Sequence, residues 1–352
     1  MSRKARLDPS IFNLPVERMR AGYYSDKYFV RTREVLLRDG YRPRVTLQVF
    51  AKQQAFLGGV DEAIAILKLC AIEWNDLEVL ALHDGDEIEP WESVMLIEGP
   101  YDAVAHLETL YLGVLARRTR VGTNTRRVVE AANGKEVMFF PARHDHWLVQ
   151  TGDGYAAHIA GAIGVSTDAQ ASWWGSEGLG TVPHAMIAAF GGNTVLAARK
   201  FAEHMEPGIK LITLVDFEND CVRTSLEVAE ALGETLYGVR LDTSEMLVDR
   251  SVIPQMGQFR PTGVCPQLVW NVRHALDRAG YNKVNIVVSG GFTVEKISHF
   301  EQLGVPVSAY GVGSSLFQGR FDFTADVVRH EGRPCAKVGR EYRPNPRLER
   351  VQ

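Results

Sequence analysis

Charged side chains follow several apolar, β-branched runs of this sequence at the point where each run ends. Asp216 closes KLITLVDF, and Arg240 and Asp242 close TLYGVRLD. Arg143 follows VMFFPA, and His184 ends GLGTVPH. A carboxylate can hydrogen-bond a sugar hydroxyl or hold Mg²⁺, and a guanidinium can bind a carboxylate or a phosphate as a planar fork. These residue types, together with an imidazole that substrate can reach, indicate a site for a phosphorylated sugar.

Two further apolar runs end in glycine and serine. The runs VNIVVSGG and VSAYGVGS supply Ser289, Gly290, Gly291, Gly311, Gly313 and Ser314. Glycine lets the backbone approach a ligand closely, and the N–H groups at the start of a following helix favour a phosphate. Barrel enzymes frequently hold a phosphate at their last two strands. We therefore interpret both turns as candidate phosphate-binding sites, although either turn alone is compatible with a simple tight turn.

Each candidate also has a purely structural interpretation. An aspartate at a strand end often caps a turn or a helix. Arginines commonly form surface ion pairs, and a histidine can be a satisfied structural residue. The chemical interpretation therefore requires that these side chains meet at one mouth of a parallel sheet.

The elements that must position these residues alternate regularly after residue 135. Short β-rich runs are separated by helical segments, which predicts parallel strands joined by crossovers. The expected strands are VMFFPA, GLGTVPH, KLITLVDF, TLYGVRLD, VNIVVSGG and VSAYGVGS. The pattern fits either a closed barrel or an open, doubly wound sheet. We predict an α/β fold in which residues 136–318 form an irregular parallel β/α barrel of the TIM type. Residues 1–135 are expected to form an N-terminal α+β domain, onto which the tail 319–352 packs back.

Composition narrows the classes of partner. The chain has 352 residues and a net charge of −4 at pH 7, which argues against a nucleic-acid partner. No run of about 18 apolar residues occurs, so we expect no membrane partner and a cytoplasmic protein. The four cysteines, Cys70, Cys221, Cys265 and Cys335, are scattered without a C-x-x-C pair. We therefore expect neither a disulfide framework nor a cluster of metal ligands.

The ordered motifs resemble the nicotinate phosphoribosyltransferase family over most of the chain. They are YYSDKYF, IEGPYDAVAHLETLYLGVLARRTRVGTNTRR, FFPARHDH, GLGTVPHAMI, LVDF, GVRLDT, VVSGGF and YGVGSSL. The resemblance implies transfer of a phosphoribosyl group from phosphoribosyl pyrophosphate to nicotinate, which gives nicotinate mononucleotide and pyrophosphate in NAD salvage. It also implies coupling to ATP hydrolysis, a requirement for Mg²⁺, and a homodimer with shared active sites.

The resemblance further implies roles for individual residues. Tyr28 is expected to stack on the pyridine ring across the dimer interface, and Arg143 to face the nicotinate carboxylate and the phosphates. Thr181 would contact substrate through its hydroxyl, and His184 would be phosphorylated by ATP. The residues expected to line the ribose–pyrophosphate pocket are Asp216, Arg240 and Asp242, and those expected to hold the 5′-phosphate are Ser289, Gly290, Gly291, Gly311, Gly313 and Ser314. Catalysis would then come mainly from positioning and from stabilising the departing pyrophosphate.

Two alternative functions stay open at this point. The chain could transfer the phosphoribosyl group to another pyridine, nicotinamide or quinolinate, and a quinolinate enzyme would need a more basic pocket for two carboxylates. A non-catalytic nucleotide-binding paralogue is the other alternative. The combination of Arg143, His184, Asp216 and Asp242 speaks against it, because binding alone does not need the whole set.

Overall fold

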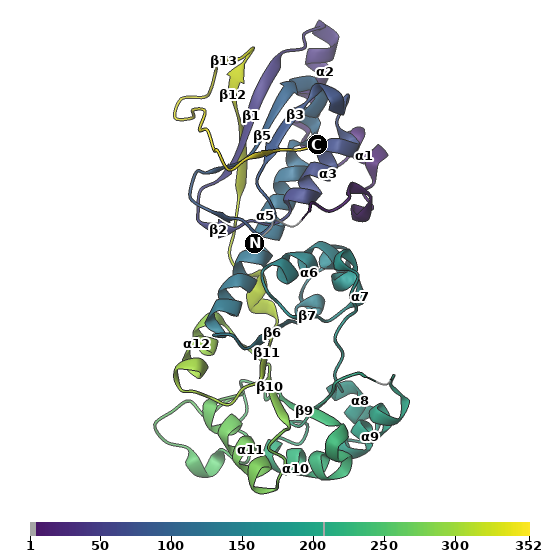
Figure 1. Cartoon of the computed structure of the whole chain (residues 1–352), viewed down its shortest axis with the longest axis vertical. Coiled ribbons are helices and arrows are strands. Elements are labelled where there is room, and N and C mark those ends of the chain that lie inside the picture. The colour runs from purple at the N-terminus through teal and green to yellow at the C-terminus, as the bar shows by residue number, and fades with distance from the viewer. Residues whose placement is uncertain (1–4, 207) are drawn as a thin grey trace. The chain divides into compact units, whose positions relative to one another are not determined.

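The computed structural model describes residues 5–206 and 208–352, and the chain divides into two compact units. Unit 1 comprises Met1–Thr123, Tyr155–Ala160 and Gln318–Gln352, and unit 2 comprises Asn124–Gly154 and Gly161–Phe317. Each unit has a sheet of its own (Figure 1).

Unit 1 is built on a six-stranded sheet in the order β13-β12-β1-β5-β3-β14. Strands β1 (Arg44–Ala51) and β5 (Ser93–Pro100) pair antiparallel at its centre. Both strands are buried over nearly their whole length, and they share a hydrophobic core with α3 (Val60–Cys70). The remaining elements are η1 (Pro9–Phe12), α1 (Val16–Arg20), α2 (Lys27–Asp39), β2 (Ala55–Phe56), η2 (Trp74–Asp76), β3 (Glu78–Ala81), β4 (Glu87–Ile88), α4 (Tyr101–Val104), η3 (Ala105–Leu107), β12 (Phe323–His330), β13 (Arg333–Pro334) and β14 (Glu349–Arg350).

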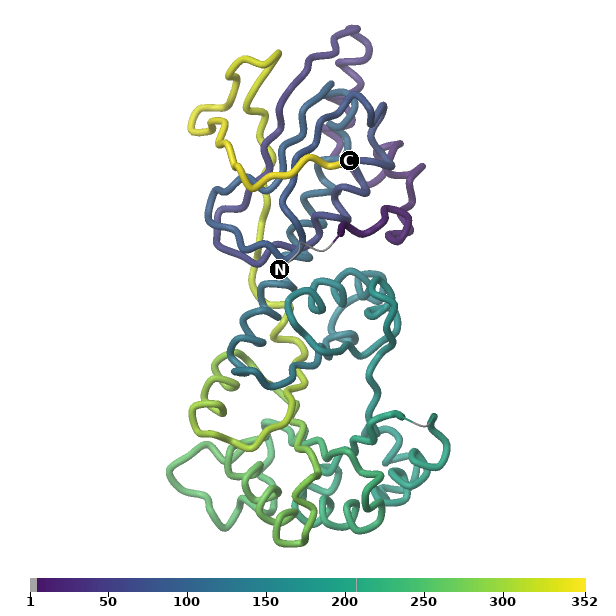
Figure 2. The backbone as a smooth tube through the Cα atoms, viewed as in Figure 1, coloured from purple at the N-terminus to yellow at the C-terminus, as the bar shows by residue number. Residues whose placement is uncertain are grey.

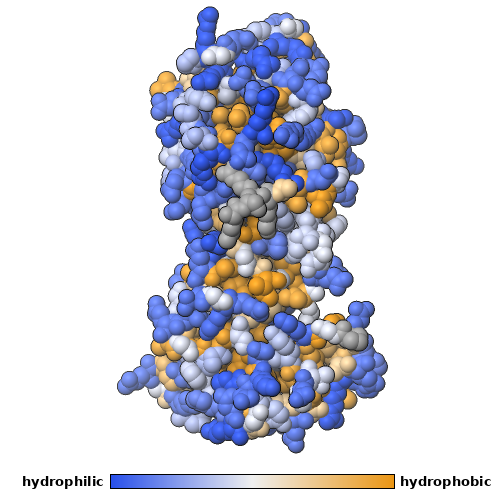
Figure 3. Space-filling model, in the orientation of Figure 1, coloured by the Kyte–Doolittle hydropathy of each residue, from blue (hydrophilic) through white to orange (hydrophobic). Residues whose placement is uncertain are grey.

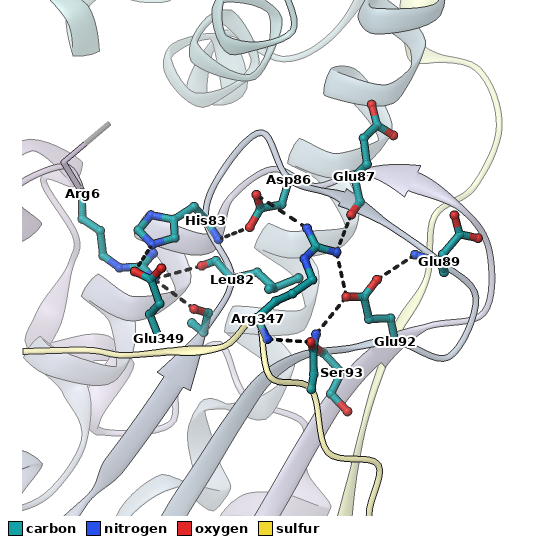
Figure 4. Close-up of polar contacts among 12 residues, drawn as sticks. Arg6, Leu82, His83, Asp86, Glu87, Glu89, Glu92, Ser93, Arg347 and Glu349 are labelled. Atoms are coloured by element: carbon teal, nitrogen blue, oxygen red, sulfur yellow. Dashed lines mark hydrogen bonds and ion pairs between the residues drawn. The ribbon is translucent and has the colours of Figure 1, made fainter. Parts of the chain in front are cut away.

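The C-terminal segment belongs to unit 1. Strand β12 pairs antiparallel with β1, and β14 pairs antiparallel with β3, so the end of the chain crosses back over the sheet (Figure 2). Arg347 fixes this return: its Nη1 donates to the carbonyl of Glu87 at 2.9 Å and to the carboxylate of Glu92 at 2.8 Å (Figure 4). The His83 ring lies 3.0 Å from the carboxylate of Glu349.

Unit 2 contains a second six-stranded sheet, in which every pairing is parallel. Its order is β7-β6-β11-β10-β9-β8. The strands are β6 (Glu136–Phe139), β7 (Gly164–Val165), β8 (Leu211–Leu214), β9 (Leu236–Leu241), β10 (Asn285–Val288) and β11 (Ala309–Val312). They are predominantly buried, as expected for parallel strands covered on both faces.

Helices surround this sheet (Figure 1). The longer ones are α9 (Thr194–His204), α10 (Cys221–Leu232), α11 (Pro266–Arg278) and α12 (Val294–Gln302). Shorter elements are η4 (Ala142–His144), η5 (Trp147–Val149), α7 (Asp168–Ala171), η6 (Ser172–Trp174), α8 (His184–Ala189), η7 (Gly233–Thr235), η8 (Ile253–Gln255) and η9 (Ser314–Phe317). The chain passes between the units within α5 (Glu108–Ala131), within α6 (Gln150–Ile159), shortly after α6 at Gly161, and directly after η9 at Gln318.

The parallel sheet curls on itself. Its last strand in sequence, β11, pairs with its first, β6, which is the neighbour relation of a barrel and not of an open, doubly wound sheet. Its edges are bridged by an irregular segment: Leu179 N donates to Val165 O at 2.6 Å, and Val182 N donates to Ile212 O at 3.0 Å. The prediction of parallel strands joined by helical crossovers is confirmed, and these strands form a curled half-barrel with β7 and β8 at its edges.

One predicted strand, GLGTVPH, is wrong. Within it only Val182 forms an isolated parallel bridge, with Thr213. Two glycines weaken this run as a strand, and Pro183 has no N–H with which to continue the ladder. The segment therefore spans the gap between β7 and β8 without becoming a strand.

The surface visible in Figure 3 is mostly hydrophilic, with scattered hydrophobic residues. None of the helices in the described part of the chain combines the length and the apolar character needed to cross a bilayer.

Candidate active site

An imidazole–carboxylate pair lies at the carboxyl ends of the parallel strands in unit 2. His184 begins α8, directly after the bridging segment, and Asp216 follows β8. The His184 Nε2–H donates to Asp216, with 3.0 Å to each carboxylate oxygen. This hydrogen bond raises the pKa of His184 above its ordinary value; Asp242 adds to the effect, and burial and the Arg240 guanidinium oppose it.

Arg240 is a half-buried cation at this mouth. It is the second-last residue of β9, and its Nε has no hydrogen-bond partner within the described residues. Burial lowers the pKa of Arg240, while the carboxylates of Asp242 and Asp216 raise it. Its guanidinium carbon lies 5.8 Å from the centre of the Phe140 ring. A guanidinium that is half-buried and incompletely bonded is suited to an anionic ligand.

The turn after β10 is fixed to the end of β9. Ser289 N donates to Leu241 O at 2.9 Å, and Ser289 Oγ donates to Asp242 Oδ1 at 2.7 Å. Gly290 and Gly291 both have positive φ, 83° and 65°, which only glycine adopts readily. A Cβ added to Gly290 would lie 3.2 Å from Asp242 Oδ1. The turn thus needs glycine for its conformation and places bare backbone at the strand end.

The end of β11, which includes Gly311, and the turn after it are crowded by aromatic side chains that follow β6. A Cβ on Gly311 would lie 2.7 Å from Phe140 Cε2, and one on Gly313 would lie 3.0 Å from His144 Cε1. Ser314 then begins η9 and is exposed. Here glycine is required by close packing between neighbouring strand ends and not by a positive φ.

These contacts link most of the predicted site residues to one another within unit 2. Arg143 is exposed on η4, close enough to Arg240 to lower its pKa electrostatically. Thr181 is half-buried next to the bridging Val182. Tyr28 is not part of this set, because it lies in unit 1, in the first turn of α2.

Two charged residues at the glycine turn were missed from the sequence. Glu245 follows β9, and its Oε1 would lie 2.0 Å from a Cβ on Gly291. Lys296, in the first turn of α12, donates from Nζ to Gly290 O at 3.2 Å. A lysine in the first turn of a helix opposes the helix dipole, and this unfavourable placement was the signal available in the sequence.

Two carboxylates are available to a divalent cation. Asp216 and Asp242 follow β8 and β9, which are neighbouring strands, and each already accepts a hydrogen bond from His184 or Ser289. No group of three or more His, Cys, Asp or Glu side chains suited to a metal occurs among residues 5–206 and 208–352. Mg²⁺ is usually held by one or two carboxylates plus substrate phosphates, so the pair fits a Mg²⁺ ion that arrives with its phosphate ligand.

Comparison with known families agrees with this geometry. Models of the N-terminal and C-terminal domains of quinolinate phosphoribosyl transferase match residues 26–119 and 121–318. The chain belongs to the quinolinate phosphoribosyl transferase family. The resemblance found in the sequence is thereby confirmed at the level of pyridine phosphoribosyltransferases.

Several proteins that are similar to this chain have nicotinate or nicotinic acid in their names. Nicotinate phosphoribosyltransferase pncB1 of Mycobacterium tuberculosis is 28% identical over 344 residues, which cover 88% of this chain and 71% of the relative. The crystal structure of nicotinate-nucleotide pyrophosphorylase from Pyrococcus furiosus superposes with a TM-score of 0.81 at 32% identity and covers 96% of this chain and 85% of that one. Human nicotinic acid phosphoribosyltransferase shares the fold, with a TM-score of 0.66 at 16% identity over 88% of this chain and 75% of the human chain.

Proposed function

We propose that this chain is a nicotinate phosphoribosyltransferase that forms nicotinate mononucleotide and pyrophosphate and hydrolyses ATP in the process. The observation that carries the proposal is the His184–Asp216 pair, with 3.0 Å from Nε2 to both carboxylate oxygens, beside the half-buried Arg240 and the glycine turns. An orienting carboxylate behind a reachable imidazole is the arrangement of an activated nucleophile.

The pair supports transfer of a phosphoryl group to His184. Since Nε2 carries the proton donated to Asp216, the neutral ring presents its lone pair at Nδ1, and Nδ1 has no hydrogen bond to the described residues. In the proposed step, Nδ1 attacks the γ-phosphorus of ATP, the bond from phosphorus to the bridging oxygen breaks, and ADP leaves. Asp216 stabilises the cationic ring that results. Water later cleaves the phosphohistidine to inorganic phosphate. The free energy of ATP hydrolysis therefore raises the affinity for substrate, and no covalent bond forms between His184 and the sugar.

The rest of the mouth suits phosphoribosyl transfer. We assign the 5′-phosphate to the two glycine turns, the pyrophosphate to Arg240, and a ribose hydroxyl to the free oxygen of Asp242. The pyridine nitrogen displaces pyrophosphate at C1 of the ribose, where positive charge develops in the transition state. Mg²⁺ held by Asp216 and Asp242 would neutralise the departing pyrophosphate. The protein's own contribution is to hold the ring nitrogen and C1 in line.

The charges at the mouth favour one ring carboxylate. Arg143, Arg240 and Lys296 are cations there, and Asp216, Asp242 and Glu245 already balance their charge. Quinolinate would bring a second carboxylate in addition to the phosphates, and three protein carboxylates make that unfavourable. Nicotinamide would leave Arg143 without an anionic partner. The match to quinolinate family models keeps quinolinate as the second candidate substrate.

Tyr28 supports a dimer with shared sites. Its ring is 60% exposed, and its hydroxyl is only 3.5 Å from the neighbouring Asp26. Asp26 itself is anchored, because Thr109 Oγ1 donates to it at 2.8 Å. An exposed aromatic ring on an anchored helix start is suited to stacking on a flat ring or a partner chain. We propose that it serves the active site of a second subunit.

Pyrophosphate release tests the proposal directly. The purified chain is supplied with phosphoribosyl pyrophosphate, Mg²⁺ and one pyridine at a time, with and without ATP. We expect release with nicotinate, stimulated by ATP, and little with nicotinamide or quinolinate. Pyrophosphate release with quinolinate and not with nicotinate would instead identify quinolinate as the substrate.

A further inference from the structure

Lys296 is a cation without an ionic partner beside the glycine turn. It lies in the first turn of α12, and its side chain folds back so that Nζ is 3.2 Å from Gly290 O. The ammonium also lies 4.4 Å from the centre of the Phe292 ring. No carboxylate in the described part of the chain forms an ion pair with it, and only one of its three N–H donors has an acceptor there.

Without a bound anion, the surroundings of Lys296 disfavour its charged form. Burial lowers the pKa of Lys296 and Arg260 adds to the lowering, while Glu245 and, to a smaller extent, Cys265 raise it. The N-terminal end of α12 is itself partially positive. Lys296 is half-buried, and an ammonium that is partly removed from water without a paired anion destabilises the fold. The arrangement is therefore explained better by an anionic ligand than by folding.

The geometry limits where that ligand can lie. Gly290 and Gly291 have positive φ and bare backbone at the mouth of the sheet, and Lys296 reaches Gly290 from the helix that follows. Glu245 Oε1 lies against Gly291, at 2.0 Å from the position of an added Cβ. Glu245 is exposed, so its carboxylate can move away when a more highly charged anion enters.

We propose that Lys296 binds the 5′-phosphate of the sugar substrate, using the two donors that the described residues leave unused, and that Glu245 competes with this phosphate for the turn. This inference rests on the proposed sugar-phosphate site and adds to it a phosphate-binding residue that lies on a helix and not at a strand end. Lys296 then has a double role, since it holds the Gly290 carbonyl and neutralises the incoming phosphate. A compact, flexible ammonium suits a tetrahedral phosphate approached from the side.

Calorimetric binding of ribose 5-phosphate to the full chain tests the inference without any pyridine or turnover. We expect Lys296→Met to weaken binding by about tenfold, as for loss of one charge-assisted hydrogen bond to phosphate. Lys283→Met is the matched control, because Lys283 is an exposed lysine before β10, and it should bind like the unmodified protein. Glu245→Gln should tighten binding by a few fold, because it removes the competing charge.

The outcomes separate the inference from the proposed function. If the unmodified chain binds ribose 5-phosphate and Lys296→Met binds equally well, Lys296 is not a phosphate ligand and the proposed function stands. If the unmodified chain does not bind ribose 5-phosphate at all, the sugar-phosphate site itself is wrong. If Lys296→Met does not fold, Lys296→Gln and Glu245→Gln are measured in its place. Weaker binding of ribose 5-phosphate by Glu245→Gln would contradict the proposed competition.

Discussion

His184 Nε2 lies 3.0 Å from both carboxylate oxygens of Asp216. Asp216 follows β8 and His184 follows the irregular segment that bridges to β8 through Val182, so the contact depends on the tertiary arrangement of unit 2. The symmetric contact fixes the proton on Nε2 and turns the other ring nitrogen outward from the pair. Under the proposed function, the same contact would link ATP use to the pH dependence of stability.

Removing the carboxylate should change the pH dependence of stability. The hydrogen bond to Asp216 raises the pKa of His184, and a histidine whose pKa is higher in the folded state adds stability below its unfolded pKa, about 6.5. This contribution is lost as the pH rises through the folded pKa. We expect Asp216→Asn to lower the free energy of unfolding more at pH 6 than at pH 9, measured by urea denaturation. An equal loss at both values would show that the pair does not titrate as described.

Removing the imidazole should uncouple ATP from the reaction. His184→Ala is expected to retain nicotinate-dependent pyrophosphate release without ATP and to lose its stimulation by ATP, because the phosphoryl acceptor is missing. Radioactivity from ATP labelled in the γ-phosphate should become bound to the unmodified protein and not to His184→Ala. Stimulation that persists in the variant would mean that another group accepts the phosphoryl group, or that none does.

A methyl group at Gly291 should damage both the turn and the phosphate site. Gly291 has a φ of 65°, and an added Cβ would lie 2.0 Å from Glu245 Oε1. We expect Gly291→Ala to cost about 1–2 kcal/mol of stability and to raise the KM for phosphoribosyl pyrophosphate by about tenfold or more.

Gly280→Ala is the control for backbone strain alone. Gly280 has a φ of 87°, and an added Cβ would meet nothing within 4 Å. Its stability loss should be of similar size, with the KM unchanged. A raised KM in Gly280→Ala would show that the effect at position 291 is general destabilisation and not loss of the phosphate turn.

Shared active sites predict complementation between inactive variants. Tyr28→Ala removes the proposed stacking ring in unit 1, and Arg240→Ala removes the half-buried guanidinium in unit 2. If each site combines Tyr28 of one subunit with Arg240 of the other, mixed dimers contain one intact site, and an equal mixture should recover about one quarter of full activity. Subunits are unfolded, mixed and refolded before the assay. Activity no higher than that of the separate variants would place both residues in the same subunit's site.

The sequence predicts the strand-end residues well for a physical reason. Parallel strands point their carboxyl ends to one edge, so Asp216, Arg240, Asp242 and Ser289 come together once their strands are located. The bridging segment around Val182 resembles a short strand through Leu179, Thr181 and Val182, although its two glycines and its proline argue against one. Its lack of a ladder depends on tertiary hydrogen bonds to both edges of the sheet.

Residues outside the strand ends were harder to foresee. Lys296 lies on a helix and Glu245 on a long loop, and their approach to the glycine turn depends on how far each side chain reaches back. No local pattern encodes that distance. Tyr28 was singled out by resemblance, and its role depends on a second subunit, so it stays a prediction until the assembly is tested.

The central claim is that the chain transfers a phosphoribosyl group to nicotinate. The most direct measurement lets ring-deuterated nicotinate and unlabelled quinolinate compete at equal concentration for one supply of phosphoribosyl pyrophosphate, with Mg²⁺ and ATP, and identifies the nucleotide by mass. We predict that the deuterated nucleotide predominates and that its yield falls when ATP is omitted. A predominantly unlabelled nucleotide would contradict the account, since the label identifies the ring whatever happens to the second carboxylate of quinolinate.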